Sequence, residues 1–247
     1  MTEWIKAKIL KIKKWNHNLF SIILKASISP FIPGQYTKLL LNKDDRIQRA
    51  YSYVNSSSNS NLEFYIVLVP NGKMTSFLYN LKVNEEISIS KKSFGFFTTR
   101  EIPKKDILWM FATGTAIGPY LSILQEKKEV FQFKKIVLIY AVRYYEDLNY
   151  LYLIKKIQRK YENKFHFISI TSRKKNTNSL FGRIPQLIEN KLIEKRIGLN
   201  ITKETSHIML CGNPEMVKET ILLLQKTRNM KKHLRRKPGE ITSENYW

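Results

Sequence analysis

Short apolar or alternating runs, separated by turn residues, occupy the N-terminal part of the chain. Five of these runs have the length and the β-branched or aromatic content of strands, at residues 19–26, 34–41, 48–55, 62–69 and 85–92. The segment 73–81 has its apolar residues on one helical face and predicts a short helix. Several short strands at this spacing predict an antiparallel β-barrel.

The remainder of the chain has a different pattern, in which each apolar strand is followed by a longer helical segment. Strands are predicted at 107–113, 135–142, 165–170 and 207–212, and helices at 116–130, 148–161, 184–191 and 214–227. Repeated strand and helix units predict a parallel sheet with helices on both faces and with ligands at the carboxyl ends of its strands. The segment 98–106 separates the two patterns, so we expect domains at 1–100 and 101–247.

Composition adds a strong positive charge to this picture. The chain has 43 Lys and Arg against 20 Asp and Glu, a formal charge of +23. Such a charge is compatible with binding to nucleic-acid phosphates, so a basic nucleic-acid-binding protein is one alternative. The lysines are spread along the whole chain, however, and its richness in Ile, Asn and Tyr indicates a coding bias that also raises the Lys content. A diffuse positive field would equally favour an acidic protein partner.

Several classes of protein and site are disfavoured. No apolar run approaches the roughly 20 residues that span a bilayer, and residues 1–15 lack the features of a signal peptide. Cys211 is the single cysteine, which excludes an internal disulfide and a four-cysteine cluster. The four histidines show no metal-ligand spacing. We therefore expect a cytoplasmic protein with neither a membrane segment nor a metal site.

Two motifs in the first half are candidates for holding a ligand. In residues 49–52, RAYS, strand alternation places Arg49 and Tyr51 on the same side. In residues 72–75, GKMT, a glycine precedes the predicted helix, whose backbone N–H groups and dipole can hold a phosphate. A simple turn with a threonine cap explains the second motif equally well.

Two further motifs follow predicted strands of the second half. Residues 112–119, ATGTAIGP, form a glycine turn between a strand and a helix, which suits a dinucleotide pyrophosphate although it lacks the G-x-G-x-x-G spacing. Residues 211–214, CGNP, end another strand, where Cys211 is either a core residue or part of a ligand-binding edge. The chain ends at 241–247 with ITSENYW, which an incidental terminus or a docked last strand would explain without a function.

The whole chain resembles the bacterial ferredoxin/flavodoxin NADP reductases. The resemblance rests on the order and spacing of RAYSY, GKMTSFL, ATGTAIGPYLSI, GRIP, CGNPEMV and HLRRKPGEITSENYW. It implies FAD on an N-terminal antiparallel Greek-key barrel, and NADP(H) on a parallel-sheet α/β domain whose C-terminal tail returns to the flavin. It also implies a monomeric flavoprotein oxidoreductase that passes a hydride from NADPH to FAD and single electrons to flavodoxin or ferredoxin. A free-flavin reductase is a related alternative.

The resemblance also assigns residues to FAD. Tyr51 would lie against one face of the isoalloxazine, Arg49 would meet the pyrophosphate, and Ser52 would sit near flavin N5. Trp247 would stack on the other face, where the nicotinamide must lie during hydride transfer, and would act as a gate. The remaining implied contacts are Ala50, Tyr65, Val67, Lys73, Met74, Thr75, Thr115 and Tyr246.

For NADP(H), the resemblance implies one site for the 2′-phosphate and another for the nicotinamide. The phosphate would meet Arg143, Arg173 and Arg183, and Ser172 would be a further NADP(H) contact. This agrees with the sheet rule, although solvated arginines are the alternative. The nicotinamide site would comprise Gly114, Thr115, Cys211, Gly212 and Asn213. The implied catalytic residues are Ser52, Cys211, Glu244 and Trp247.

Electron carriers of this family are acidic, so the resemblance implies a basic docking surface. Two groups of cations are candidates, and for both the alternative is an ordinary solvated charge run. They are Arg235, Arg236 and Lys237 near the C-terminus, and Arg173, Lys174 and Lys175 after a predicted strand.

Overall fold

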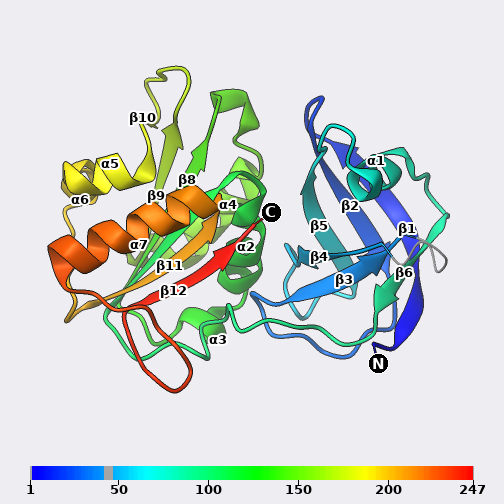
Figure 1. Ribbon diagram of the computed structural model, residues 1–247, viewed down its shortest axis with the longest axis horizontal. Coiled ribbons are helices and arrows are strands. Elements are labelled where there is room, and N and C mark those ends of the chain that lie inside the picture. Colours follow the sequence, from blue (N-terminus) through cyan, green and yellow to red (C-terminus); the bar gives the residue numbers. More distant parts are fainter. Residues whose placement is uncertain (1, 42–46, 247) are drawn as a thin grey trace. The chain divides into compact units, whose positions relative to one another are not determined.

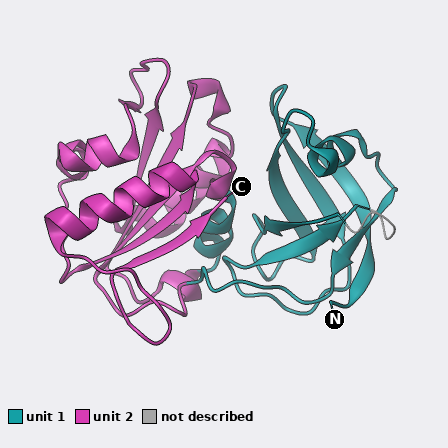
Figure 2. Ribbon diagram, in the orientation of Figure 1, with its two compact units in different colours: residues 1–98, 118–126 teal, residues 99–117, 127–247 magenta. Residues whose placement is uncertain are grey.

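The computed structural model describes residues 2–41 and 47–246. The chain divides into two compact units (Figure 2), residues 1–98 with 118–126 and residues 99–117 with 127–247. Trp247 lies outside the described residues, so its role as a gate stays a hypothesis.

The first unit contains a six-stranded antiparallel sheet of the barrel type, which confirms the predicted fold (Figure 1). Its elements are β1 (Trp4–Lys14), β2 (Leu19–Lys25), β3 (Tyr36–Leu40), β4 (Gln48–Ser52), β5 (Asn61–Val67), α1 (Lys73–Asn80) and β6 (Glu86–Ser90). The strand order is β4-β3-β6-β1-β2-β5, so β4 lies at one edge. The helix α1 buries Met74 and Leu78 against this sheet, as its apolar pattern predicts.

The longest strand, β1, is an addition to the five that the pattern predicts. Its buried residues Ala7 and Ile9 alternate with exposed lysines such as Lys6, Lys8 and Lys11. Alternation of this kind is the signature of a half-buried strand. Because lysines fill the exposed positions, this segment contains no apolar run, and a prediction based on apolar runs misses the strand.

The helix α2 (Ile117–Gln125) belongs to the first unit although it follows the first strand of the second. Its Ser122 hydroxyl donates to the carbonyl of Asn55 at 2.7 Å, and the Gln125 amide donates to the carbonyl of Val54 at 2.8 Å. A Cβ on Gly118 would stand 3.3 Å from Cγ2 of Val54, so a small residue is needed at this close approach. The chain therefore passes between the units three times, at 98/99, 117/118 and 126/127.

The second unit contains a six-stranded parallel sheet, as predicted, in the order β10-β9-β8-β7-β11-β12. The strands are β7 (Ile107–Thr113), β8 (Lys135–Val142), β9 (Phe165–Thr171), β10 (Leu180–Phe181), β11 (Ser206–Gly212) and β12 (Ile241–Asn245). The longer helices are α4 (Leu151–Tyr161) and α7 (Pro214–Arg228), and the shorter ones are α3 (Lys127–Val130), α5 (Ile184–Glu189) and α6 (Leu192–Ile197).

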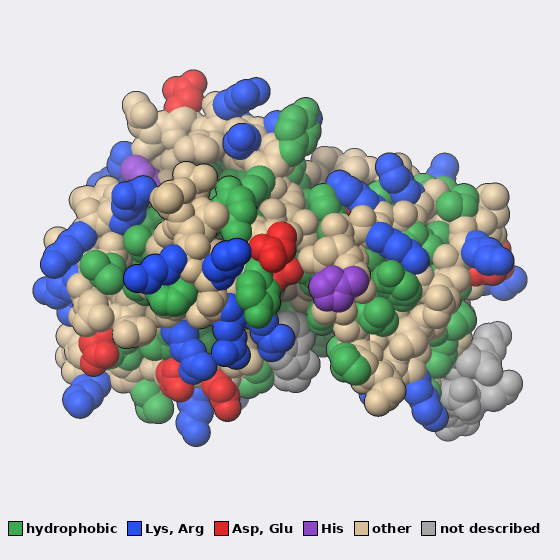
Figure 3. Space-filling model, turned by 90° about the horizontal axis from the view of Figure 1, so that it is seen from above, with side chains coloured by type: hydrophobic (Ala, Val, Ile, Leu, Met, Phe, Trp, Pro, Cys, Tyr) green, Lys and Arg blue, Asp and Glu red, His purple; other side chains and the backbone are tan. Residues whose placement is uncertain are grey.

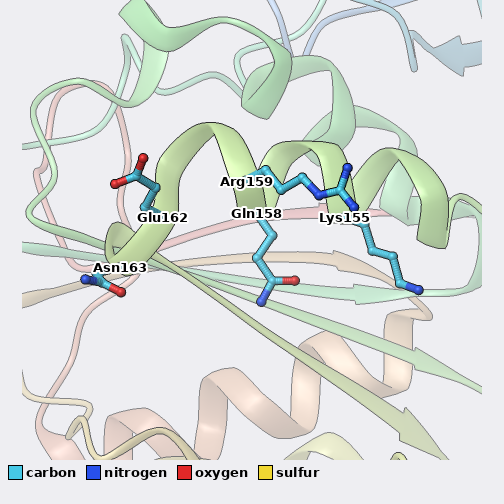
Figure 4. Close-up of a pocket in the computed structure, with 5 residues that line it drawn as sticks. All are labelled: Lys155, Gln158, Arg159, Glu162 and Asn163. Atoms are coloured by element: carbon cyan, nitrogen blue, oxygen red, sulfur yellow. The ribbon is translucent and has the colours of Figure 1, made fainter.

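Helices cover both faces of this sheet. Residues of α5, α6 and α7 share one buried cluster with alternate strand residues such as Trp109, Phe111 and Val137. Figure 4 shows α4 on the other side of the strands from α7. In the described residues no helix is long and apolar enough to cross a membrane.

The C-terminal segment is a docked strand as far as Asn245. β12 pairs in parallel with β11, with Ile208 opposite Ile241 and Gly212 opposite Asn245. The backbone N–H of Tyr246 continues the pairing by donating to the carbonyl of Gly212 at 2.9 Å. The tail therefore follows the sheet toward the carboxyl ends of its strands.

Candidate active site

The RAYS segment forms the exposed edge strand of the first unit. β4 pairs with β3 so that Thr37 lies opposite Tyr51 and Leu39 opposite Arg49. Arg49 and Ala50 are exposed, Tyr51 is half-buried and Ser52 is buried. The ring of Tyr51 meets Phe64 edge to face at 6.4 Å. Burial raises the pKa of the Tyr51 hydroxyl, with Arg49 opposing the shift, so the phenol remains neutral.

The amino terminus of α1 carries no side-chain cap. Gly72 is the N-cap residue, and the Thr75 hydroxyl instead accepts from the backbone N–H of Val69 at 3.2 Å. This corrects the alternative in which a threonine caps the helix. The first N–H groups of a helix lack intrahelical acceptors, so this turn can offer donors to an anion.

The other predicted flavin residues of the first unit differ in exposure. Lys73 is exposed, Val67 is half-buried, and Met74 is buried in the core. Tyr65 is buried and meets Trp15 edge to face at 6.4 Å. The side chain of Met74 therefore packs in the core, and the backbone of this residue is the part available to a ligand.

In the second unit the ATGT motif forms the turn that leaves β7. Gly114 has φ +56°, and a Cβ there would meet nothing within 4 Å, so the backbone conformation rather than space favours glycine. Thr115 is buried in the following short 3₁₀ turn.

The cysteine of CGNP is fully buried beside the C-terminal strand. Cys211 lies opposite Ala112 of β7 and Glu244 of β12, and it has no exposed surface. Burial, together with the negative charge of Glu244, raises the pKa of the Cys211 thiol well above its usual range. The thiol is therefore neutral, and Cys211 stands both in the core and at the edge where the strands end.

The turn after Cys211 is locked to β7 by Thr113. The Thr113 hydroxyl accepts from the backbone N–H of Asn213 at 2.8 Å. Gly212 has φ +139°, and a Cβ there would overlap the Thr113 hydroxyl. The Asn213 side chain accepts from the N–H groups of Glu215 and Met216 at 2.9 and 3.2 Å, so it caps α7. Our sequence reasoning missed Thr113, although its place at the end of an apolar strand is a usable signal.

The three predicted phosphate-binding arginines gather at one edge of the second unit. Arg143 follows β8, Arg173 follows β9, and Arg183 follows β10 as the N-cap residue of α5. The backbone N–H of Arg173 donates to the carbonyl of Arg143 at 3.0 Å, and that of Ser172 donates to the carbonyl of Val142 at 3.1 Å. The adjacent strand ends therefore bring these residues together.

The arginine side chains at this edge are exposed and available. Within the described part of the chain none of the three forms an ion pair with a carboxylate. Figure 3 shows more Lys and Arg than Asp and Glu over this face of the second unit. The edge thus offers unpaired guanidinium groups, which suit a phosphate.

The second group of candidate cations lies at the opposite edge of the same sheet. Arg235 and Arg236 form the turn of a small hairpin in which Leu234 and Lys237 exchange hydrogen bonds at 2.9 and 3.0 Å. Arg235 also pairs with Glu101 at 3.3 Å. Because the hairpin precedes β12, it stands at the amino ends of the parallel strands.

Neither metal ligands nor the α4 pocket add to this site. A pocket of about 340 Å³ is lined by Lys155, Gln158, Arg159, Glu162 and Asn163 (Figure 4). The pocket lies along the carboxyl half of α4, which leads into the amino end of β9. The three arginines, in contrast, follow the carboxyl ends of their strands. The described residues contain no group of three or more His, Cys, Asp or Glu that could hold a metal ion.

Two family models match the chain, one in each half. The oxidoreductase FAD-binding domain matches residues 7–96, and the oxidoreductase NAD-binding domain matches residues 110–221.

Individual proteins match over the full length. A flavodoxin/ferredoxin–NADP reductase of Buchnera aphidicola subsp. Schizaphis graminum is 56% identical, and one of Escherichia coli K12 is 50% identical, each covering 100% of both chains. A crystal structure of a ferredoxin NADP+ reductase from Neisseria gonorrhoeae with bound FAD and NADP is 31% identical, with a TM-score of 0.92 and 100% coverage of both chains.

The Thr113 contact yields a test by hydrogen exchange. Thr113→Val removes the acceptor of the Asn213 N–H, so we expect that amide to lose protection and the protein to lose about 1 kcal/mol of stability. Thr113→Ser keeps the hydroxyl and should retain both. Amide exchange resolved at Asn213 measures the difference; equal protection in the two variants would show that the hydroxyl does not hold the turn.

Proposed function

The chain belongs to the flavodoxin/ferredoxin–NADP reductases, and from this membership we propose that it transfers electrons between NADPH and flavodoxin or ferredoxin through a bound FAD. The observation that carries the proposal is identity of 50% or more to reductases of this name over the entire chain. The FAD-binding family model matches the N-terminal half of the chain, and the NAD-binding family model matches the C-terminal half.

The first unit has features that fit FAD. Arg49 is exposed on the edge strand, and α1 begins without a side-chain cap. A guanidinium group and free backbone N–H groups suit a pyrophosphate. We propose that these groups hold the pyrophosphate and that the neutral ring of Tyr51 supports one face of the isoalloxazine.

Bound FAD would accept a hydride from the nicotinamide and release the two electrons one at a time, which is the cofactor's own chemistry. The residues of the chain would orient the rings and exclude water. We assign Gly114 and Thr115 to the turn that receives the nicotinamide, and the uncharged Cys211 thiol to its apolar wall. Glu244, beside Cys211 in the adjacent strand, is our candidate for tuning the site through its charge.

We assign the NADP(H) 2′-phosphate to Arg143, Arg173 and Arg183, because these exposed cations gather where strand carboxyl ends meet. Ser172, between β9 and Arg173, adds a hydroxyl to the same group. NADH lacks this phosphate, so the arginines would favour NADPH over NADH.

The Arg173→Ala variant tests this assignment. It removes a charge-assisted hydrogen bond, so we expect the Michaelis constant for NADPH to rise about tenfold or more while that for NADH changes little. Arg159→Ala, at an exposed arginine of α4, is the matched control and should change neither. Steady-state kinetics with both nucleotides provide the measurement, and an equal rise for both would refute the assignment.

We propose that the electron carrier docks at the cations that follow the carboxyl end of β9, and not at the hairpin that precedes β12. Electrons must leave near the flavin, and the residues of the second unit that we assign to the flavin, Thr115 and Tyr246, follow the carboxyl ends of β7 and β12. Lys174 shares that edge, because its carbonyl accepts from the Thr171 hydroxyl at 2.7 Å. Arg236 stands at the other edge.

Charge reversal distinguishes these two surfaces. Lys174→Glu should lower kcat/KM for flavodoxin and ferredoxin several-fold at low salt, with the loss shrinking as salt screens the charges. Arg236→Glu makes the same charge change at the hairpin and should have little effect. A larger loss with Arg236→Glu would place docking there, and reduction of free FMN but of neither carrier by the parent protein would favour a free-flavin reductase.

A further inference from the structure

Two histidines contact each other at the amino end of β11 and have no role in the site described so far. His207, in β11, is fully buried, and His233, in the hairpin that precedes β12, is half-buried. Their rings meet edge to face, with centroids 5.9 Å apart. In the part of the chain that the structure describes, Nδ1 of His207 and Nε2 of His233 are buried and have no hydrogen-bond partner. A positive charge on either ring would therefore lack a compensating acceptor.

Both histidines hold the first residues of β12. The Nε2 atom of His207 shares a hydrogen bond with the Thr242 hydroxyl at 2.9 Å. The backbone N–H of His233 donates to the carbonyl of Ile241 at 2.7 Å. Because β12 lies at the edge of the sheet beside β11, the hairpin supplies the backbone support on its other side, where Lys232 bridges to Ile241.

The side chain of His233 holds the hairpin closed as a hydrogen-bond acceptor. The backbone N–H of Gly239 donates to its Nδ1 atom at 3.2 Å. Only a ring nitrogen without a proton can accept, so His233 is neutral and carries its proton on Nε2. Protonation would place a second N–H opposite that of Gly239 and break the bond. A metal ion at Nε2 would require the same proton on Nδ1, so this arrangement responds to protons and disfavours a metal.

The surroundings also disfavour a charged His233. Among the described residues neither histidine forms an ion pair with a carboxylate. Of the acidic residues in this region, Glu240 accepts from the backbone N–H of Lys231 at 2.8 Å, and Glu101 pairs with Arg235 at 3.3 Å. The cations are Lys105 before β7, and Lys231, Lys232, Arg235, Arg236 and Lys237 of the hairpin.

Burial decides which of the two rings takes up a proton first. It lowers the pKa of His207 to about 3, and the charges of His233 and Lys105 add to this shift. His207 is therefore neutral in the range from pH 5 to 8, in which histidine ordinarily titrates. His233 is the ring that solvent protons reach in that range, because it is only half-buried.

We propose that His207 and His233 form a pH-sensitive latch on β12. In neutral solution His233 accepts from Gly239 and keeps the hairpin closed against the start of the strand. Protonation of His233 breaks this bond, so the hairpin opens and the start of β12 loses its support. β12 leads to Tyr246, and acid therefore loosens the C-terminal tail. The latch is independent of the proposed function, whereas its consequence for a flavin rests on it.

The test is amide hydrogen exchange of the full-length, FAD-loaded protein at pH 7.5 and pH 5.5. Rates are converted to protection factors, which removes the intrinsic effect of pH on exchange. We expect the amides of Gly239 and Ile241 to lose about tenfold in protection at pH 5.5, the equivalent of about one hydrogen bond. The Tyr246 amide, which donates to the carbonyl of Gly212, should lose protection with them.

His233→Asn is the variant that removes the titration and keeps the acceptor. Asparagine places an amide oxygen where histidine has Nδ1, so it can accept from Gly239 at either pH. We expect this variant to keep its protection at pH 5.5. His17→Asn, at an exposed histidine of the first unit, is the matched control and should behave like the parent.

His207 adds a separate effect of the same sign. Because its folded pKa of about 3 lies below that of an unfolded histidine, the unfolded chain binds more protons below about pH 6.5, and the overall stability falls with pH. His233→Asn retains this contribution. Comparison of the parent with His233→Asn at one pH therefore isolates the latch.

Three outcomes would overturn the proposal. The first is equal protection of Gly239 and Ile241 at the two pH values in the parent, which needs no variant. The second is the same acid-induced loss in His233→Asn, and the third is a loss confined to the hairpin with the Tyr246 amide unchanged. None of these measurements requires turnover, so each of them leaves the reductase function standing.

Discussion

The parallel pairing of β11 with both β7 and β12 is the constraint on which the nucleotide half of the molecule depends. Parallel strands end at the same edge of a sheet, so each strand delivers its last residues to one place. Cys211 consequently lies opposite Ala112 and Glu244. The contacts of Thr113 with Gly212 and Asn213 then set the turn beyond the strand. A shift of one residue in this pairing would turn every side chain of the strand to the other face.

The first unit presents by a different arrangement the groups that we assign to FAD. The strand β4 lies at an edge of the antiparallel sheet and carries the exposed Arg49 and the half-buried Tyr51. In the same unit, α1 begins at a glycine without a side-chain cap. The two units thus expose cations and backbone donors by opposite means, one at the side of an antiparallel sheet and the other at the end of a parallel sheet.

Much of this architecture could be predicted from the sequence, because periodicity reports which face of an element is buried. The change from alternating strands to strand and helix units gives both sheet types, and the sheet rule points to Arg143 and Arg173. The strand β1 was missed because lysines fill its exposed positions. The strand β12 was raised only as one explanation of the terminus, because its pairing with β11 is long-range and leaves no periodic pattern in five residues.

The details of the candidate site were harder to predict for a related reason. The membership of α2 in the first unit, the capping role of Asn213 and the position of the Arg235 hairpin depend on which segments meet in space. Motif spacing says nothing about such meetings. The expected roles of individual residues came from the resemblance to a family. The hydrogen-bond partners in the structure show which side chains are already engaged.

We propose that NADPH, held at the carboxyl edge of the parallel sheet, passes a hydride directly to FAD. The most direct test of this proposal is anaerobic stopped-flow absorption of the FAD-loaded protein mixed with NADPH carrying deuterium at the transferred C4 position or with ordinary NADPH. We expect ordinary NADPH to bleach the flavin band and the deuterated nucleotide to do so more slowly. No bleaching, or the same rate with both nucleotides at every concentration, would contradict it.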